Sequence, residues 1–238
     1  MSNALKSLSF AIIMGIVCSL LLTTASTGLR RYQQRNIRID RQKNILQAAG
    51  LWDDSQPTVA GDIENLFDES LQTLFLDQTG RIVSETDRKP EDLPIWLYTE
   101  GDLVKAYVVP IDTTGLWGEI HGYLAFEADG VTVRGFTVFK HSETPGLGGE
   151  IEKRWFQKNF VGKKVVNAEG DFVSIGVAKG VVEKMVPEEK QENYVDGISG
   201  ATLTGKYLTE GLADILRDYE PVAIKFRRNQ CGKVTLCQ

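Results

Sequence analysis

One short segment of the sequence combines small residues with hydroxyl groups: Asp196-Gly-Ile-Ser-Gly-Ala-Thr-Leu-Thr204. It immediately precedes an amphipathic segment with helical periodicity, which we expect to begin near Gly205. The first turn of a helix has unpaired backbone N–H groups and the positive end of the helix dipole, so it favours an anion such as phosphate. Gly200 and Ala201 would let a bulky phosphate approach the backbone without a side-chain clash. The segment therefore predicts an anion site at a helix start.

The same segment allows a simpler interpretation, in which its hydroxyl groups only cap the helix. Serine and threonine side chains at a helix start accept hydrogen bonds from backbone N–H groups and stabilise the helix. Ser199, Thr202 or Thr204 could each take this position. The residue types alone leave capping and anion chemistry as two open alternatives.

The elements that must position this segment are predicted from periodicity. Apolar residues at a helical spacing predict a final amphipathic helix over 207–219 that ends before Pro221. The strongest strand pattern covers 120–127 and 131–139, and the intervening Ala128-Asp-Gly predicts a hairpin turn. Weaker patterns predict helices over 62–67 and 153–160 and strands over 73–77, 81–83 and 172–178. Strands and helices in mixed order predict an α+β fold with an antiparallel sheet.

The chain is expected to begin with a single membrane-spanning helix. No charged residue occurs from Ser7 to Leu29, and roughly 20 apolar residues span a bilayer. A cleaved signal peptide is the alternative, but the apolar run is longer than a typical signal core and no clean cleavage site follows it. We expect residues 1–29 to contain the span, 30–60 to form a juxtamembrane helix and linker, and 61–238 to form the α+β domain.

Composition argues against several classes of protein. A formal net charge of -5 and a pI near 5.2 give no broad basic surface for nucleic acid. Three cysteines, Cys18, Cys231 and Cys237, are too few and scattered for a disulfide scaffold or a cysteine-based metal site, although a Cys231–Cys237 bridge stays open. With only two histidines and no nucleophile elbow, P-loop or dinucleotide fingerprint, the sequence gives no catalytic residue and no metal site.

Asp196–Thr204 resembles the flavinylation motif of FMN-binding domains, D-[GA]-x-[ST]-G-A-T-x-[ST], at every position. In that family a dedicated flavin transferase attaches the FMN phosphate to the threonine after Gly-Ala as a phosphoester. The resemblance therefore implies covalent FMN on Thr202. The neighbouring residues that it places in the cofactor site are Asp196, Ser199, Gly200 and Ala201.

Two further stretches resemble the same domains. His141-Ser-Glu-Thr-Pro-Gly-Leu-Gly148 is similar to a loop that approaches the flavin, and Leu116-Trp-Gly118 is similar to a segment near the isoalloxazine ring. Lys179 loosely matches a lysine of the flavin pocket. For Trp117, an ordinary core aromatic is the alternative. The residues implied to hold the ring system are Glu143, Thr144, Gly146, Leu147, Leu116, Trp117 and Lys179, in an FMN-binding region of about 100–220.

Together with the span, these motifs make nearly the whole chain similar to the C subunit of the sodium-translocating NADH:quinone oxidoreductases. The resemblance implies an electron-transfer subunit of a bacterial inner-membrane complex that is not catalytic alone. Its implied partners are the other subunits, the flavin transferase and the lipid bilayer. The G subunit of the Rnf ferredoxin:NAD oxidoreductase is the related alternative, and a membrane-anchored interaction domain without redox chemistry is the other.

The charges that flank the span conflict with this resemblance. Cationic residues cluster from Arg30 to Lys43 after the span, whereas only Lys6 precedes it. The positive-inside bias would therefore place the following domain in the cytoplasm. In the resembling family the domain lies on the periplasmic side, where the transferase acts. Because the bias has exceptions for long translocated domains, we expect the periplasmic side.

Overall fold

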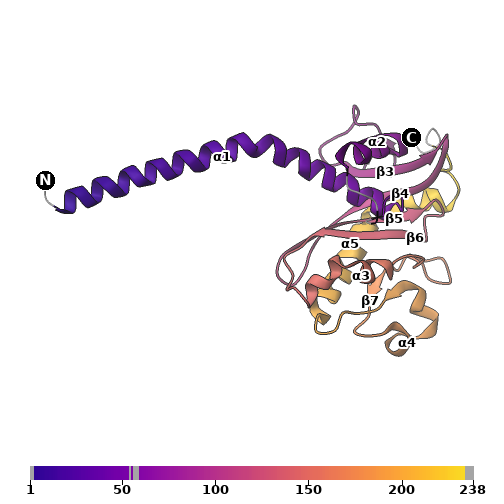
Figure 1. Cartoon of the computed structure of the whole chain (residues 1–238). Helices are drawn as coiled ribbons and strands as arrows, with labels where there is room; N and C mark the ends of the chain where they lie inside the picture. Colours follow the sequence, from indigo (N-terminus) through magenta and orange to yellow (C-terminus); the bar gives the residue numbers. More distant parts are fainter. Residues whose placement is uncertain (1–2, 54, 56–58, 234–238) are drawn as a thin grey trace. The chain divides into compact units, whose positions relative to one another are not determined.

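The computed structural model describes residues 3–53, 55 and 59–233 (Figure 1). The chain divides into two compact units, Met1–Arg41 and Gln42–Gln238. The elements in chain order are α1 (Asn3–Ala48), α2 (Ala60–Ser70), β1 (Leu71–Leu76), β2 (Ile82–Val83), β3 (Leu93–Glu100), β4 (Leu103–Thr114), β5 (Glu119–Glu127), β6 (Val133–Lys140), η1 (Gly148–Glu152), α3 (Arg154–Lys158), β7 (Gly176–Val177), α4 (Val182–Met185), η2 (Glu188–Asn193), β8 (Tyr194–Val195) and α5 (Thr202–Arg227).

The helix α1 is continuous and contains the predicted span. Within the described residues, it alone is long and apolar enough to cross a membrane. Its apolar side chains, including Leu20 and Leu22, are exposed, as a surface that faces lipid requires. The helix ends at Ala48, and Gly50 follows with a φ of +70°. A glycine at this position suits a helix end, because glycine readily adopts the left-handed conformation that follows many helices.

Six antiparallel strands form the main sheet of the second unit, in the order β2-β1-β3-β4-β5-β6. The predicted hairpin is confirmed by β5 and β6, with Gly130 in its turn at a φ of +66°. The strands predicted over 73–77 and 81–83 are confirmed by β1 and β2, which pair with each other in antiparallel orientation. Sequence patterns missed β3 and β4, whose runs contain Pro94 and Pro110, because proline weakens a strand signal. The predicted α+β class with an antiparallel sheet is confirmed.

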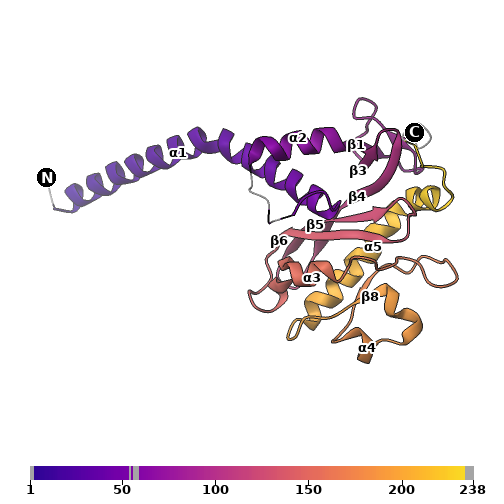
Figure 2. The ribbon, with the colours of Figure 1, turned by 45° about the vertical axis from the view of Figure 1, so that its right-hand side comes forward.

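Helices cover both faces of this sheet (Figure 1 and Figure 2). On one face lie α2 and the last turns of α1, where the Thr137 hydroxyl of β6 donates a hydrogen bond to the carbonyl oxygen of Asn44 at 3.3 Å. On the other face, α5 packs against side chains that include the neighbouring Phe136. Successive strand residues point to opposite faces, so β6 contributes side chains to the packing on both faces of the sheet.

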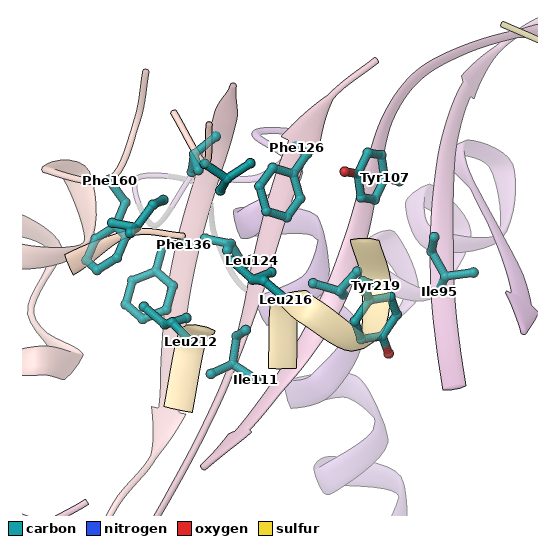
Figure 3. Close-up of a cluster of buried hydrophobic side chains, with 14 of the residues drawn as sticks. Ile95, Tyr107, Ile111, Leu124, Phe126, Phe136, Phe160, Leu212, Leu216 and Tyr219 are labelled. Carbon is teal, nitrogen blue, oxygen red and sulfur yellow. The ribbon is translucent and has the colours of Figure 1, made fainter. Parts of the chain in front are cut away.

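The side chains of α5 form the centre of the hydrophobic core on its face of the sheet (Figure 3). Leu212 and Leu216 are buried against the sheet. Nearer the end of the helix, the Tyr107 ring of β4 stacks on Phe126 at 5.1 Å and on Phe226 at 4.4 Å between ring centroids. Burying one large apolar side chain contributes about 1.5–3 kcal/mol. The sheet therefore fixes where α5 lies and, with it, where its first turn emerges.

The prediction that the last helix ends before Pro221 is wrong, because α5 continues past this residue. A proline inside a helix removes one hydrogen bond and costs about 3 kcal/mol. The residues beyond it include Val222 and Phe226, which are buried in the core. Their burial offsets the cost of the proline.

The predicted strand over 172–178 is also wrong in its extent, because β7 contains only Gly176–Val177. Ser174 has a φ of +65°, and this left-handed conformation interrupts an extended backbone. The short strand pairs in parallel with β8 in a separate two-stranded sheet. The short helix predicted over 153–160 is confirmed by α3.

Helix α5 approaches β4 at Gly211, where an added Cβ atom would lie 2.6 Å from the Cβ of Thr113. We expect Gly211→Ala to push the helix off the sheet and lower the free energy of unfolding by about 1–3 kcal/mol, as overpacking does. Gly61→Ala in α2 is the control, because nothing lies near its added Cβ and alanine favours a helix by about 0.5–1 kcal/mol over glycine. Urea unfolding of the detergent-solubilised chain measures the free energy of unfolding of both variants. A value for Gly211→Ala equal to that of the wild type would contradict the close contact.

Candidate functional site

Thr202 is the first residue of α5, and its side chain is exposed. The expected helix start near Gly205 is therefore too late. Ala201 is the N-cap residue and makes no side-chain hydrogen bond to the helix. The hydroxyl of Thr204 donates to a carboxylate instead. Within the described residues no side chain forms a capping hydrogen bond to this helix, so the interpretation of the segment as a helix cap is wrong.

A cavity of about 690 Å³ opens beside Thr202. Three lysines line it, Lys179, Lys190 and Lys206, and the nearby Glu210 carboxylate lies 3.7 Å from the Lys206 ammonium. Lysines beside a helix start create a positive potential that favours a phosphate group. The rest of the wall is mostly apolar, and it comes from Val177, Ala178, Met185, Val186, Pro187, Tyr194, Leu203 and Thr209.

The cavity wall that carries Lys179 is braced by Asp196. The Asp196 Oδ1 atom accepts a hydrogen bond from the backbone N–H of Val182 at 2.7 Å. The backbone N–H of Gly197 donates to the carbonyl oxygen of Gly180 at 2.9 Å. These bonds continue the β7–β8 pairing and join the segment before α4 to the segment before α5.

Glu143 is a buried carboxylate, 4% exposed, that meets three segments of the chain. Its Oε2 atom accepts a hydrogen bond from the Thr204 hydroxyl at 2.6 Å, and its Oε1 atom accepts one from the backbone N–H of Trp117 at 2.9 Å. Its own backbone N–H donates to Nδ1 of His141 at 3.1 Å. The carboxylate therefore joins the loop before β5 and the loop after β6 to the first turn of α5.

The ring of His141 is held in one orientation. Because Nδ1 accepts from Glu143, the neutral ring carries its proton on Nε2, which lies 3.2 Å from Oε2 of Glu152. The Lys153 ammonium, with a smaller contribution from His141, holds the pKa of Glu152 below its ordinary value. Glu152 thus stays ionised at neutral pH and keeps the imidazole in place.

The loop after β6 turns onto the segment that carries Thr202. The backbone N–H groups of Leu147 and Gly149 donate to the carbonyl oxygen of Thr144 at 3.1 and 2.9 Å. Gly146 has a φ of +75° and Gly200 a φ of +77°, which glycine adopts without strain. A Cβ atom at Gly200 would lie 2.8 Å from Cδ2 of Leu147, so this leucine packs directly over the turn.

The structure brings most of the sequence-predicted residues together. Glu143 and Leu147 reach the turn around Thr202, and Lys179 lines the same cavity as Thr202. Trp117 is 69% exposed, so the alternative that it is a core aromatic is wrong. The side chains of Leu116, Trp117 and Thr144 are exposed around the site, and Ser199, Gly200 and Ala201 directly precede Thr202.

Several lining residues were not predicted from the sequence. Lys206 follows Thr202 by one helical turn, and this spacing was a usable signal because such residues share a helix face. Lys190 lies in η2 and Met185 at the end of α4. Only the tertiary fold brings these two residues to the cavity, so local patterns could not indicate them.

The arrangement fits a ligand with a phosphate group and a largely apolar body. The uncapped helix start and the lysines suit the phosphate, and the apolar cavity wall suits the body. Residues 115–217 match the family model described as the FMN-binding domain. This range contains all three segments that Glu143 joins. Fold and site together define a membrane-anchored protein with an FMN-binding domain.

Comparison with known proteins identifies the family. The chain is 31% identical over 234 residues to the C subunit of the Na(+)-translocating NADH-quinone reductase of Vibrio campbellii, with 84% of this chain and 85% of the relative covered. It is 34% identical over 224 residues to the subunit of the same name from Haemophilus ducreyi, with 84% of each covered. The chain belongs to the family of C subunits of the Na(+)-translocating NADH-quinone reductases.

Solved structures share the architecture. The crystal structure of the C subunit from Parabacteroides distasonis is similar with a TM-score of 0.69 and 28% identity, covering 82% of this chain and 96% of that one. NqrC from Shewanella oneidensis is similar with a TM-score of 0.66 and 23% identity, covering 83% and 99%. At this lower identity, the second comparison supports the fold only.

The brace at Asp196 makes a prediction about the cavity wall. We expect Asp196→Ala to release the segment before α4 and to speed tryptic cleavage after Lys179 and Lys184 about tenfold, because a hydrogen bond to a charged group is lost. Asp196→Asn should cleave at the wild-type rate, because its amide oxygen still accepts from Val182. Asp214→Ala, on the exposed face of α5, is the matched control. Fast cleavage in the asparagine variant would show that the brace depends on charge rather than on this bond.

Proposed function

We propose that the chain is the electron-transfer C subunit of a Na(+)-translocating NADH-quinone reductase and that it carries FMN in phosphoester linkage on Thr202. The observation that carries this proposal is the exposed Thr202 hydroxyl at an uncapped helix start, beside a cavity with three lysines. Membership of this family supports the quinone-reductase complex over the G subunit of the Rnf complex. A non-redox interaction domain would have no use for this lysine-lined cavity at a helix start.

The described residues would hold FMN from both ends. Lys179, Lys190 and Lys206 balance the phosphate charge, and Gly200 lets the backbone approach the phosphate closely. Ser199 and Ala201 shape the same turn. The apolar side chains at the ring system would be Leu147, Leu203, Leu116 and Trp117, with Thr144 and Gly146 in the covering loop.

Bound FMN supplies one-electron and two-electron redox chemistry. The chain's own residues would hold the FMN and orient it. A covalent tether keeps the cofactor on a subunit that passes electrons between other subunits, so we expect no NADH oxidation by this chain alone. The other subunits, the flavin transferase and the lipid around residues 1–29 are its proposed partners.

We propose the following division of the chain. The span and N-terminus take residues 1–29, and the juxtamembrane helix and linker take 30–60. The α+β domain takes 61–238, with the FMN-binding region at about 100–220. In this division the span only anchors the chain, while the electron-transfer chemistry belongs to the last part.

Substitution at Thr202 tests the attachment. We expect the chain co-expressed with a flavin transferase to gain the mass of FMN less one water, because an ester forms, and to fluoresce in a denaturing gel. Thr202→Ala should lose both signals completely, whereas Ser199→Ala should keep them. Intact mass spectrometry measures the gain. A flavin that stays attached in Thr202→Ala would refute the assignment to this residue.

The second unit is proposed to lie on the periplasmic side of the bacterial inner membrane. Cys231 is fully buried and disulfide-bonded, and disulfides persist in oxidising compartments such as the periplasm. Cys237, the other cysteine of the bridge that the sequence allows, lies outside the described residues. The disulfide supports the periplasmic side against the cationic flank from Arg30 to Lys43.

Reporter fusions test this orientation. Alkaline phosphatase fused after Arg41 should be active, because it folds only where its own disulfides form. A green fluorescent protein fusion at the same point should be dark when exported through the general secretion route. The reverse pattern would place the domain in the cytoplasm and overturn the proposed side.

A further inference from the structure

Glu143 is buried, yet no ion pair to it occurs among the described residues. Burying an ionised carboxylate is unfavourable unless hydrogen bonds compensate for the lost water. Here each oxygen has one neutral donor, the Thr204 hydroxyl at 2.6 Å and the Trp117 N–H at 2.9 Å. Thr204 lies in the first turn of α5, where the helix dipole also favours a negative charge. In this geometry each side-chain oxygen of Glu143 has a hydrogen-bond donor from the protein.

Two glycines preserve the space that the carboxylate needs. A Cβ atom at Gly148 would lie 2.6 Å from Oε2 of Glu143, and a Cβ at Gly115 would collide with Oε1. Both glycines have ordinary backbone conformations with φ outside the left-handed region. Close approach to Glu143, rather than backbone freedom, explains why glycine stands at both positions.

This geometry gives Glu143 a role in the hydrogen bonding between the protein's own segments. The sequence resemblance placed it among those that hold the flavin ring. In the structure both oxygens instead face donors from the protein's own loops. We propose that Glu143 is a positioning residue: its carboxylate latches the loop before β5 and the loop after β6 onto the first turn of α5, and so fixes the turn that presents Thr202.

The proposal depends on the proposed function in one respect: Thr202 must be the residue that receives FMN. A leucine at position 143 fills a similar volume but offers no acceptor. A glutamine keeps both bonds, because its oxygen accepts from the Trp117 N–H and its amide donates to the Thr204 oxygen. Thr204→Val and Thr204→Ser form a second pair, in which only serine can donate to Glu143.

The first readout is the rate at which a flavin transferase loads FMN onto the full-length chain, followed by intact mass. We expect Glu143→Leu and Thr204→Val to load about tenfold more slowly, because the leucine variant loses both hydrogen bonds of the Glu143 side chain and the valine variant loses the one from Thr204. Glu143→Gln and Thr204→Ser should load within about twofold of wild type. The glutamine amide still bonds to Trp117 and Thr204, and the serine hydroxyl still donates to Glu143. Circular dichroism confirms that each variant is folded.

The second readout needs no flavin. In the FMN-free chain, hydrogen exchange at the Trp117 amide should be about tenfold faster in Glu143→Leu and unchanged in Glu143→Gln, because the glutamine still protects that N–H. If the wild-type chain takes up no FMN, the proposed function fails. The exchange measurement still tests whether the Glu143 side chain holds the loop that contains Trp117.

Wild-type loading and wild-type exchange in Glu143→Leu would overturn the proposal. Glutamine and leucine variants that are equally impaired would also overturn it, because the charge rather than the latch would then matter. If Glu143→Leu does not fold, the Thr204 pair decides in its place. Equal loading by the valine and serine variants would count against the latch.

Discussion

The burial of one face of α5 against the antiparallel sheet is the constraint on which the rest of the domain depends. Leu212, Leu216 and the residues around Phe226 anchor the helix across the central strands. Since these contacts fix the helix axis, they also fix where its first turn leaves the core. Everything that faces Thr202, including the lysines of the cavity and the loop that carries Leu147, is arranged around that end of the helix.

A polar constraint operates at the same helix end. Three segments that are distant in sequence converge on one buried carboxylate, and hydrogen bonds set their spacing more sharply than apolar contact would. The surrounding glycines belong to this arrangement. The site is therefore preorganised by a buried polar network, while most of the side chains that would touch a cofactor remain exposed around it, as Trp117 does.

Local patterns in the sequence predicted the features that are encoded locally. The segment before Thr202, the β5–β6 hairpin and the period of α5 can each be recognised within a short window. The extension of α5 beyond Pro221 could not be, because burial of Phe226 by distant strands stabilises it. The same holds for Lys190, which the fold alone brings to the cavity, and for Glu143, whose burial has no local signature. The family resemblance, rather than a local pattern, placed Glu143 in the site.

The edges of the main sheet also matter to how the domain behaves among other chains. One edge strand, β2, has only two residues. At the other edge, the N–H and carbonyl of Val133 are already paired with Lys163 and Gly162 at 2.8 Å, and the Arg134 side chain donates to the Ala49 carbonyl. Long unpaired edges invite another chain to add a strand. At β2 and at Val133, the strand of a second copy would therefore find little free backbone with which to begin a shared sheet.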